Sequence, residues 1–131
     1  MIPPLVVPAL GLTRIVIGTG LLVNPTGLGR ALGATDPEQT APVGRLLGAR
    51  EIAIGLGTLV AWRRGQSTAF WVAAQAISDA SDTLAFAAAA MTGRVTRARG
   101  WGMAAFAASG AISEALTARA LEKEERASAL Q

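Results

Sequence analysis

The sequence predicts an all-α protein, a four-helix transmembrane bundle whose helices run up-down-up-down. Three observations lead to this prediction. Hydrophobic residues make up 51% of the 131-residue chain. Charged residues make up only 16%, whereas a typical soluble domain carries about 25%. The charges are also clustered, and the four stretches between them are long enough to cross a membrane, which takes about 20 mostly apolar helical residues.

Each expected span stops at a cluster of turn-forming or charged residues. The first span ends at Asn24 and Pro25, and the fourth passes into a tail rich in Glu, Lys and Arg. We therefore expect one membrane domain over residues 1–121 and a charged soluble tail over residues 122–131. The four expected spans are residues 4–23, 43–62, 68–91 and 101–120.

The longest connection lies between the first two spans. Its segment Gly27–Gly33 predicts a short interfacial helix, and the other connections are short, so that successive spans should be antiparallel. Trp62, Trp71 and Trp101 fall near span ends, where an interfacial aromatic belt would place them. Arginines flank both sides in similar number, which leaves the membrane orientation open.

The residue types that are missing exclude several chemistries. The chain has no Cys, no His and no Tyr, and its one Lys is Lys123 in the tail. This excludes thiol nucleophiles, His-based triads, and zinc or haem ligation by Cys or His. We expect no cofactor and no metal. The net charge of +3 comes mostly from arginines in the connections, without a basic stripe interleaved with aromatics, so the expected partner is the lipid bilayer and not nucleic acid.

Ionisable residues lie near the middle of the spans. Such a group at membrane depth costs about 2.5–3.5 kcal/mol on insertion scales, so it is usually paired, turned inward and functional. Helical spacing aligns small and polar residues on one face of each span, and we expect these faces to meet in a common centre. The aligned sets are Gly11, Arg14 and Gly18; Gly44, Gly48, Glu51 and Gly55; Gln75, Asp79, Asp82 and Phe86; and Phe106, Gly110, Ser113 or Glu114, and Thr117.

The expected centre contains more acids than bases. One arginine faces four carboxyl groups, and the two arginines that helical phase places off the polar faces still leave one acid in excess. A water-poor centre disfavours excess charge, so at least one carboxyl should be neutral near pH 7. Asp79 and Asp82, three residues apart, are the candidates. The inward arginine is Arg14, the other two are Arg45 and Arg50, and the remaining acids are Glu51 and Glu114.

Carboxylates beside a fixed cation favour a membrane protein that binds a lipid-soluble small molecule. Acid–base chemistry on that molecule, of the isomerase, cyclase or epoxide-opening type, is a further possibility. The predicted catalytic residues are Asp79, Asp82, Glu51 and Glu114, and the predicted ligand-binding residues are Arg14, Arg50 and Gln75.

Other functions stay open beside ligand binding. Arg14 has an alternative role as a structural counter-ion of Glu51 or Glu114. In that case the protein is a structural or accessory subunit, and its buried charges only hold the helices in register. A proton-linked transporter, working as a homo-oligomer, is the third alternative. Two acids alone are a weak signal for a divalent cation at Asp79 and Asp82.

The sequence Arg-Leu-Leu-Gly-Ala-Arg-Glu-Ile-Ala-Ile-Gly at residues 45–55, with Arg14 before it and Asp79 and Asp82 after it, resembles a known family. This is an uncharacterised family of small bacterial four-helix integral membrane proteins with an Arg-Gly-Arg/Glu signature on the second helix. The resemblance extends over residues 10–114. It implies a multi-pass protein of the bacterial inner membrane, and it assigns no activity and no site residue.

Overall fold

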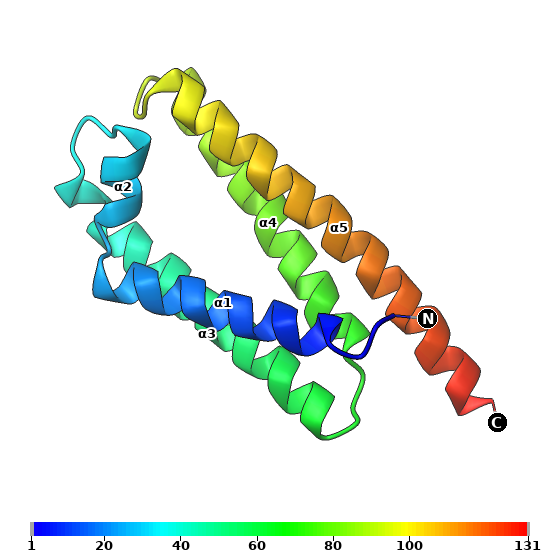
Figure 1. The fold of residues 1–131 in the computed structure, drawn as a ribbon. Helices are drawn as coiled ribbons and strands as arrows, with labels where there is room; N and C mark the ends of the chain where they lie inside the picture. The colour runs from blue at the N-terminus through cyan, green and yellow to red at the C-terminus, as the bar shows by residue number, and fades with distance from the viewer. Residues whose placement is uncertain (1, 131) are drawn as a thin grey trace.

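Two antiparallel helix pairs make up the fold, as Figure 1 shows. The computed structural model describes residues 2–130 and confirms an all-α chain with four long helices and a short helix after the first. α1 packs along α3, and α4 packs along α5, whereas contacts between the two pairs are fewer. The helices are α1 (Val6–Val23), α2 (Gly27–Leu32), α3 (Ala41–Arg63), α4 (Ala69–Met91) and α5 (Arg97–Ala129), with one 3-10 turn, η1 (Glu38–Thr40), before α3.

Glycine and proline set most of the helix ends. α1 ends before Asn24 and Pro25. The turns after α3 and α4 contain Gly65 and Gly93, whose φ angles of 61° and 70° are left-handed and cost glycine little. These ends agree with the sequence prediction. α5 runs further than the expected fourth span, because the tail residues are good helix formers and continue the helix to Ala129.

The charged end of α5 caps the beginning of α4. The Glu125 carboxylate accepts hydrogen bonds from the backbone N–H groups of Thr68 at 2.8 Å and Ala69 at 3.2 Å, and from the Ser67 hydroxyl at 2.7 Å. Partial burial opposes ionisation of this carboxyl, but the three donors outweigh it and lower the pKa of Glu125 below its ordinary value. Glu125 thus serves as an N-cap for α4 that another helix supplies.

Glycines allow α1 and α3 to touch backbone to backbone. A Cβ atom on Gly18 would lie 2.6 Å from the Gly48 carbonyl oxygen, and one on Gly48 would lie 2.7 Å from the Gly18 carbonyl oxygen. Gly11 and Gly55 form a second reciprocal contact of this kind, and Gly44 lies against the backbone of the turn after α1. Gly44 and Gly48 therefore have the close-packing role that their spacing predicts.

Few large hydrophobic side chains are buried in this protein, and many are exposed. Its largest fully buried side chains are Gln75, Val72 and Thr58, and most of its buried hydrophobic residues are alanines. Large hydrophobic side chains from all four long helices are exposed instead. They include Leu12, Val16 and Ile17 of α1, Leu46 and Leu56 of α3, Ile77 and Leu84 of α4, and Ile112 and Leu116 of α5.

One helix has the length and hydropathy of a membrane span. Among the described residues only α1 qualifies, with a mean hydropathy of 1.9 over its 18 residues. Core helices of soluble proteins and signal sequences also have these properties, so α1 alone does not establish a multi-pass protein. Charged residues reduce the hydropathy of α3, where Arg45, Arg50 and Glu51 lie close together, and Asp79 and Asp82 do the same in α4.

One aromatic residue does not lie where the sequence places it, and another makes a contact that the sequence did not predict. Phe106 was expected on the inner face of α5 but is 70% exposed, and Ala104 and Ala107 are buried at that level instead. Small residues are needed there because α4 and α5 approach closely. Trp71 packs its ring against Gly57 of α3, so it is an interhelical contact as well as a residue near a helix end.

The glycine contacts between α1 and α3 lead to the first prediction. Replacing Gly18 with Ala should lower the free energy of unfolding by about 1–3 kcal/mol, since the methyl group meets backbone atoms that side-chain rotation cannot move. Chemical denaturation in detergent micelles would measure it. Gly20→Ala in the same helix is the control, because that position has open space, and it should leave stability unchanged or raise it by up to about 1 kcal/mol. Equal losses in both variants would contradict the packing role.

Candidate functional site

A buried ion-pair network joins all four long helices near their midpoints. Arg14 of α1 lies at its centre, and its guanidinium Nη1 is 2.7 Å from Glu51 Oε2 of α3 and 2.7 Å from Asp79 Oδ1 of α4. Its Nη2 is 2.6 Å from Glu114 Oε1 of α5. The Arg14 side chain is 9% exposed. The polar faces therefore meet in a common centre, as the helical spacing predicts.

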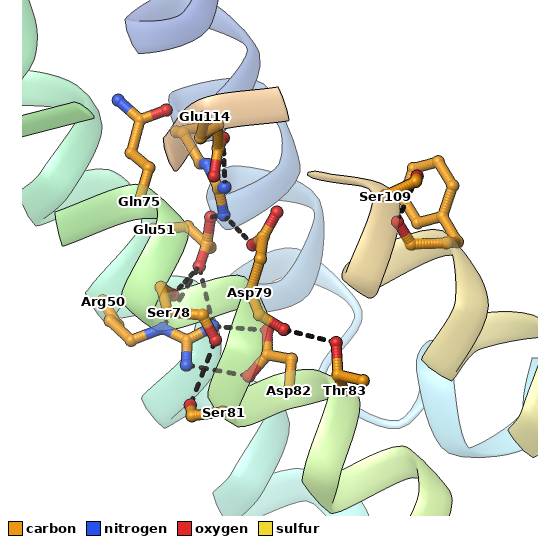
Figure 2. A network of polar contacts seen from close by, with 12 residues as sticks. Arg50, Glu51, Gln75, Ser78, Asp79, Ser81, Asp82, Thr83, Ser109 and Glu114 are labelled. Carbon is orange, nitrogen blue, oxygen red and sulfur yellow. Dashed lines mark hydrogen bonds and ion pairs between the residues drawn. The ribbon is translucent and has the colours of Figure 1, made fainter. Parts of the chain in front are cut away.

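A second arginine extends the network towards α4. Arg50 binds both carboxylate oxygens of Asp82, with Nη1 at 2.9 Å from Oδ1 and Nη2 at 2.7 Å from Oδ2. Its Nη2 also donates to Glu51 Oε1 at 2.8 Å. Figure 2 shows Arg50 between Glu51 and Asp82, with Ser78 beside them. Glu51 thus bridges the two arginines. Helical phase placed Arg50 off the polar face, but its long side chain reaches back into the centre.

Gln75 is sealed inside the bundle. Its side-chain amide donates to the Thr58 hydroxyl at 2.9 Å, and that hydroxyl donates to the Ile54 carbonyl oxygen at 2.9 Å. Gln75 Oε1 and Glu114 Oε2 are buried and have no hydrogen-bond partner among the described residues. Gln75 was predicted to bind a ligand; in this structure it contributes to helix packing and has no exposed surface.

The network carries more negative charge than the sequence count indicated. Arg45 is exposed, and within residues 2–130 it forms no ion pair. Two guanidinium groups therefore face four carboxyl groups, which leaves two acids in excess if all are ionised. Excess charge in a water-poor interior is unfavourable, so protons or a cation should reduce it.

A cavity of about 620 Å³ opens beside the network. It lies between the first half of α3, the second half of α4, and α2 with the segments on either side of it, residues 25–40, which we call the α2 region. Asp82 is the one member of the ion-pair network that lines it. Most of the remaining lining is apolar, and sequence reasoning did not identify it. The large apolar side chains of the lining are Leu28, Leu32, Val43, Leu47, Phe86 and Val95, and its charged residues besides Asp82 are Asp36 and Arg94.

The α2 region covers this cavity because it is tied to the turn between α4 and α5. The Thr96 N–H donates to the Leu32 carbonyl oxygen at 3.0 Å, and the Thr35 N–H donates to the Arg94 carbonyl oxygen at 3.2 Å. Gly33 ends α2 with a left-handed φ of 65°, which turns the chain towards this contact. The only sequence signal for the cover was the predicted short helix itself.

The chemistry of this site is limited to carboxylates and arginines. Among the described residues, no group of three or more His, Cys, Asp or Glu side chains could hold a metal ion. Glu51 and Asp79 bind arginine inside the bundle, and Asp82 can still accept a further hydrogen bond from a molecule in the cavity. The site can therefore hold protons in the network and bind a polar group at Asp82.

Arg14 should be the side chain on which stability depends most. Replacing it with Gln leaves three carboxyl groups without their shared partner, so the free energy of unfolding should fall by about 3–5 kcal/mol, as for other broken buried ion pairs. Arg45→Gln is the matched control, and its effect should stay within about 0.5 kcal/mol because the residue is exposed. Denaturation curves that coincide for the two variants would show that the network is not needed for stability.

We further expect Glu114 to be a neutral carboxyl of the network. Both oxygens of Asp82 bind an arginine, whereas Glu114 Oε2 is buried without a partner. Glu114→Gln imitates the protonated acid and should change stability by less than about 1 kcal/mol, well below the cost of breaking a buried pair. The infrared spectrum of the wild-type protein should contain the carbonyl band of a protonated carboxyl group. This band should be absent from the spectrum of Glu114→Gln and present in that of Asp79→Asn. The reverse pattern would assign the proton to Asp79.

Comparisons with known proteins found no match for this chain among family models, curated proteins or solved structures. The resemblance that residues 45–55 suggest therefore stays a prediction. What is established is a four-helix chain with a buried network centred on Arg14.

Proposed function

We propose that the chain is a small multi-pass integral membrane protein that binds a lipid-soluble molecule between its helices. The observation that carries this proposal is the reversed distribution of residue types, with charges at the centre and large hydrophobic side chains outside. Soluble monomers rarely expose contiguous apolar patches larger than a few hundred Å². A hydrocarbon environment gives the exposed leucines, isoleucines and valines of all four helices a favourable partner.

The arrangement of charge along the bundle also supports a membrane location. The exposed charges gather near the two ends, whereas the network lies near the middle of the long helices. This is the pattern of flanking anchors and an internal, paired functional group in membrane proteins. Charged residues at one end include Arg63, Arg64 and Glu122, and those at the other end include Arg94, Arg97 and Arg99.

The cavity beside Asp82 supports ligand binding. Its volume of about 620 Å³ is within the usual range for small-molecule sites, roughly 300–1,000 Å³. Its mostly apolar lining suits a hydrophobic molecule, and Asp82 offers a polar contact beside the ion-pair network. Of the four predicted catalytic carboxyl groups, only Asp82 borders this space. Asp36, the other carboxyl group of the lining, lies near the α2 end of the cavity, in the segment after that helix, so the support extends to binding and not to isomerisation, cyclisation or epoxide opening.

A structural or accessory subunit is the second candidate function. The observation in its favour is that Arg14 is fully engaged by carboxylates from the three other long helices. In such a protein the network only fixes how the helix pairs cross, and the cavity has no constant occupant. No specific observation favours the proton-linked transporter.

The test uses membranes that contain wild-type protein, Ala89→Phe or Ala80→Phe. Ala89 lines the cavity, whereas Ala80 is an exposed residue of the same helix outside it. All three proteins should stay in the membrane through an alkaline carbonate wash. Mass spectrometry after mild detergent extraction should find a small apolar compound with wild type and Ala80→Phe. We expect that compound to be lost from Ala89→Phe, because the phenyl ring fills its site.

The outcomes separate the parts of the proposal. Release of folded wild-type protein by carbonate would contradict the membrane location. Retention in the membrane without any bound compound in the three proteins would favour the structural role. A compound that binds equally to Ala89→Phe would place the binding site elsewhere on the bundle.

A further inference from the structure

The cavity lining carries an excess of negative charge. Asp82 lies beside the network, Asp36 lies in the segment after α2, and Arg94 is in the turn after α4. The lining thus holds two carboxylates and one guanidinium group in a mostly apolar space, and Arg50, which does not line it, binds Asp82 from the network. A positively charged ligand would balance this lining, and an anionic ligand would increase the imbalance.

The ion-pair network behind the cavity has the same sign. Its four carboxyl groups exceed its two arginines by two. A proton on Glu114 would leave one negative charge uncompensated. Buried charge is stabilised by an opposite charge within hydrogen-bond reach. A ligand with one positive charge at Asp82 therefore brings the centre to neutrality, which neither an alcohol nor a carboxylic acid does.

Asp82 has the capacity for such a contact. Each of its oxygens accepts one hydrogen bond from Arg50, and a carboxylate has about four acceptor positions. The side chain is 19% exposed, which is more than Glu51 or Glu114. A donor in the cavity can therefore bind Asp82 while Arg50 keeps its two bonds.

We propose that the cavity takes a lipophilic amine whose ammonium group donates to the Asp82 carboxylate, an inference that rests on the ligand-binding function proposed above. The apolar body of the amine lies along Leu47 and Phe86 towards Val95. The nine helical steps from Asp82 to Met91, where α4 ends, correspond to about 13–14 Å at a rise of ~1.5 Å per residue. That distance accommodates an extended alkyl chain of medium length.

The test compares three probes that differ only in their polar group: dodecylamine, dodecanol and dodecanoate. Each is added to protein in uncharged micelles at the same mole fraction, and binding is followed by native mass spectrometry and by the shift in thermal unfolding. Wild-type protein should bind dodecylamine at least roughly tenfold more tightly than dodecanol, since a hydrogen bond to a charged group contributes about that much. Dodecanoate should bind more weakly than either.

Asp82→Asn should abolish the preference for the amine, and Asp36→Asn should retain it because Asp36 lies near the α2 end of the cavity, in the segment after that helix. Because Asp82→Asn leaves Arg50 without its main partner, a double variant, Arg50→Gln with Asp82→Asn, removes one charge of each sign, and Glu51 keeps its bond to Arg14. This double variant should fold, bind dodecanol as wild type does, and show no preference for the amine.

Each outcome decides between the two proposals. If wild-type protein binds none of the three probes, the ligand-binding function itself fails. If dodecanol or dodecanoate binds as tightly as dodecylamine, the cavity binds ligands and only the amine assignment fails. Loss of the preference in Asp36→Asn, with retention in Asp82→Asn, would also overturn the proposal, because the ammonium group would then lie at Asp36.

Discussion

The structure depends on one guanidinium group that three helices share. Arg14 binds Glu51, Asp79 and Glu114, and each of these carboxyl groups comes from a different helix. Because an unpaired charge in a water-poor interior is costly, the three helices have to present their acids at the same level as Arg14. This constraint fixes how far each helix can slide along its neighbours. It also fixes the depth of the second arginine, since Glu51 is bonded to both.

Close packing of small residues and polar contacts between side chains both stabilise the bundle. Within each helix pair, small residues allow close approach, as Gly18 and Gly48 do between α1 and α3. Between the pairs, the ion pairs and the hydrogen bond from Gln75 to Thr58 act beside an apolar cluster, in which Val7 of α1 packs with residues of α4 and α5. Dispersion forces therefore act within and between the pairs, and the ion pairs add directional contacts that orient one pair against the other. The cavity lies between α3 and α4, and α2, the segment after it and the turn after α4 close the space.

Much of the fold is readable from the sequence because it follows from local chemistry. Turn residues such as Pro25, Gly65 and Gly93 mark the helix ends, and spacing along each helix identifies Arg14 and its three acids. The parts that were not predicted depend on tertiary contacts. The hydrogen bonds that hold α2 over the cavity join backbone groups far apart in the chain, and hydrophobic patterning does not encode them.

Long side chains and helix packing explain the remaining differences. Helical phase describes the direction of a Cβ atom, but a guanidinium group several bonds away can reach a neighbouring face, as Arg50 does. Phase alone also does not distinguish which of two adjacent faces becomes the inner one. α4 and α5 approach closely, so the inner face of α5 holds the small residues Ala104 and Ala107, and Phe106 is exposed.

The separation of the partners in the chain has a consequence for biosynthesis. Glu51 follows Arg14 by 37 residues, and Glu114 follows it by 100. Arg14 is therefore translated well before the acids that pair with it. The first of these acids, Glu51, lies on α3, the helix whose glycines pack against α1. The α1–α3 pair can therefore form the Arg14–Glu51 ion pair before α4 has been translated. Completion of the network has to wait until α5 has been translated.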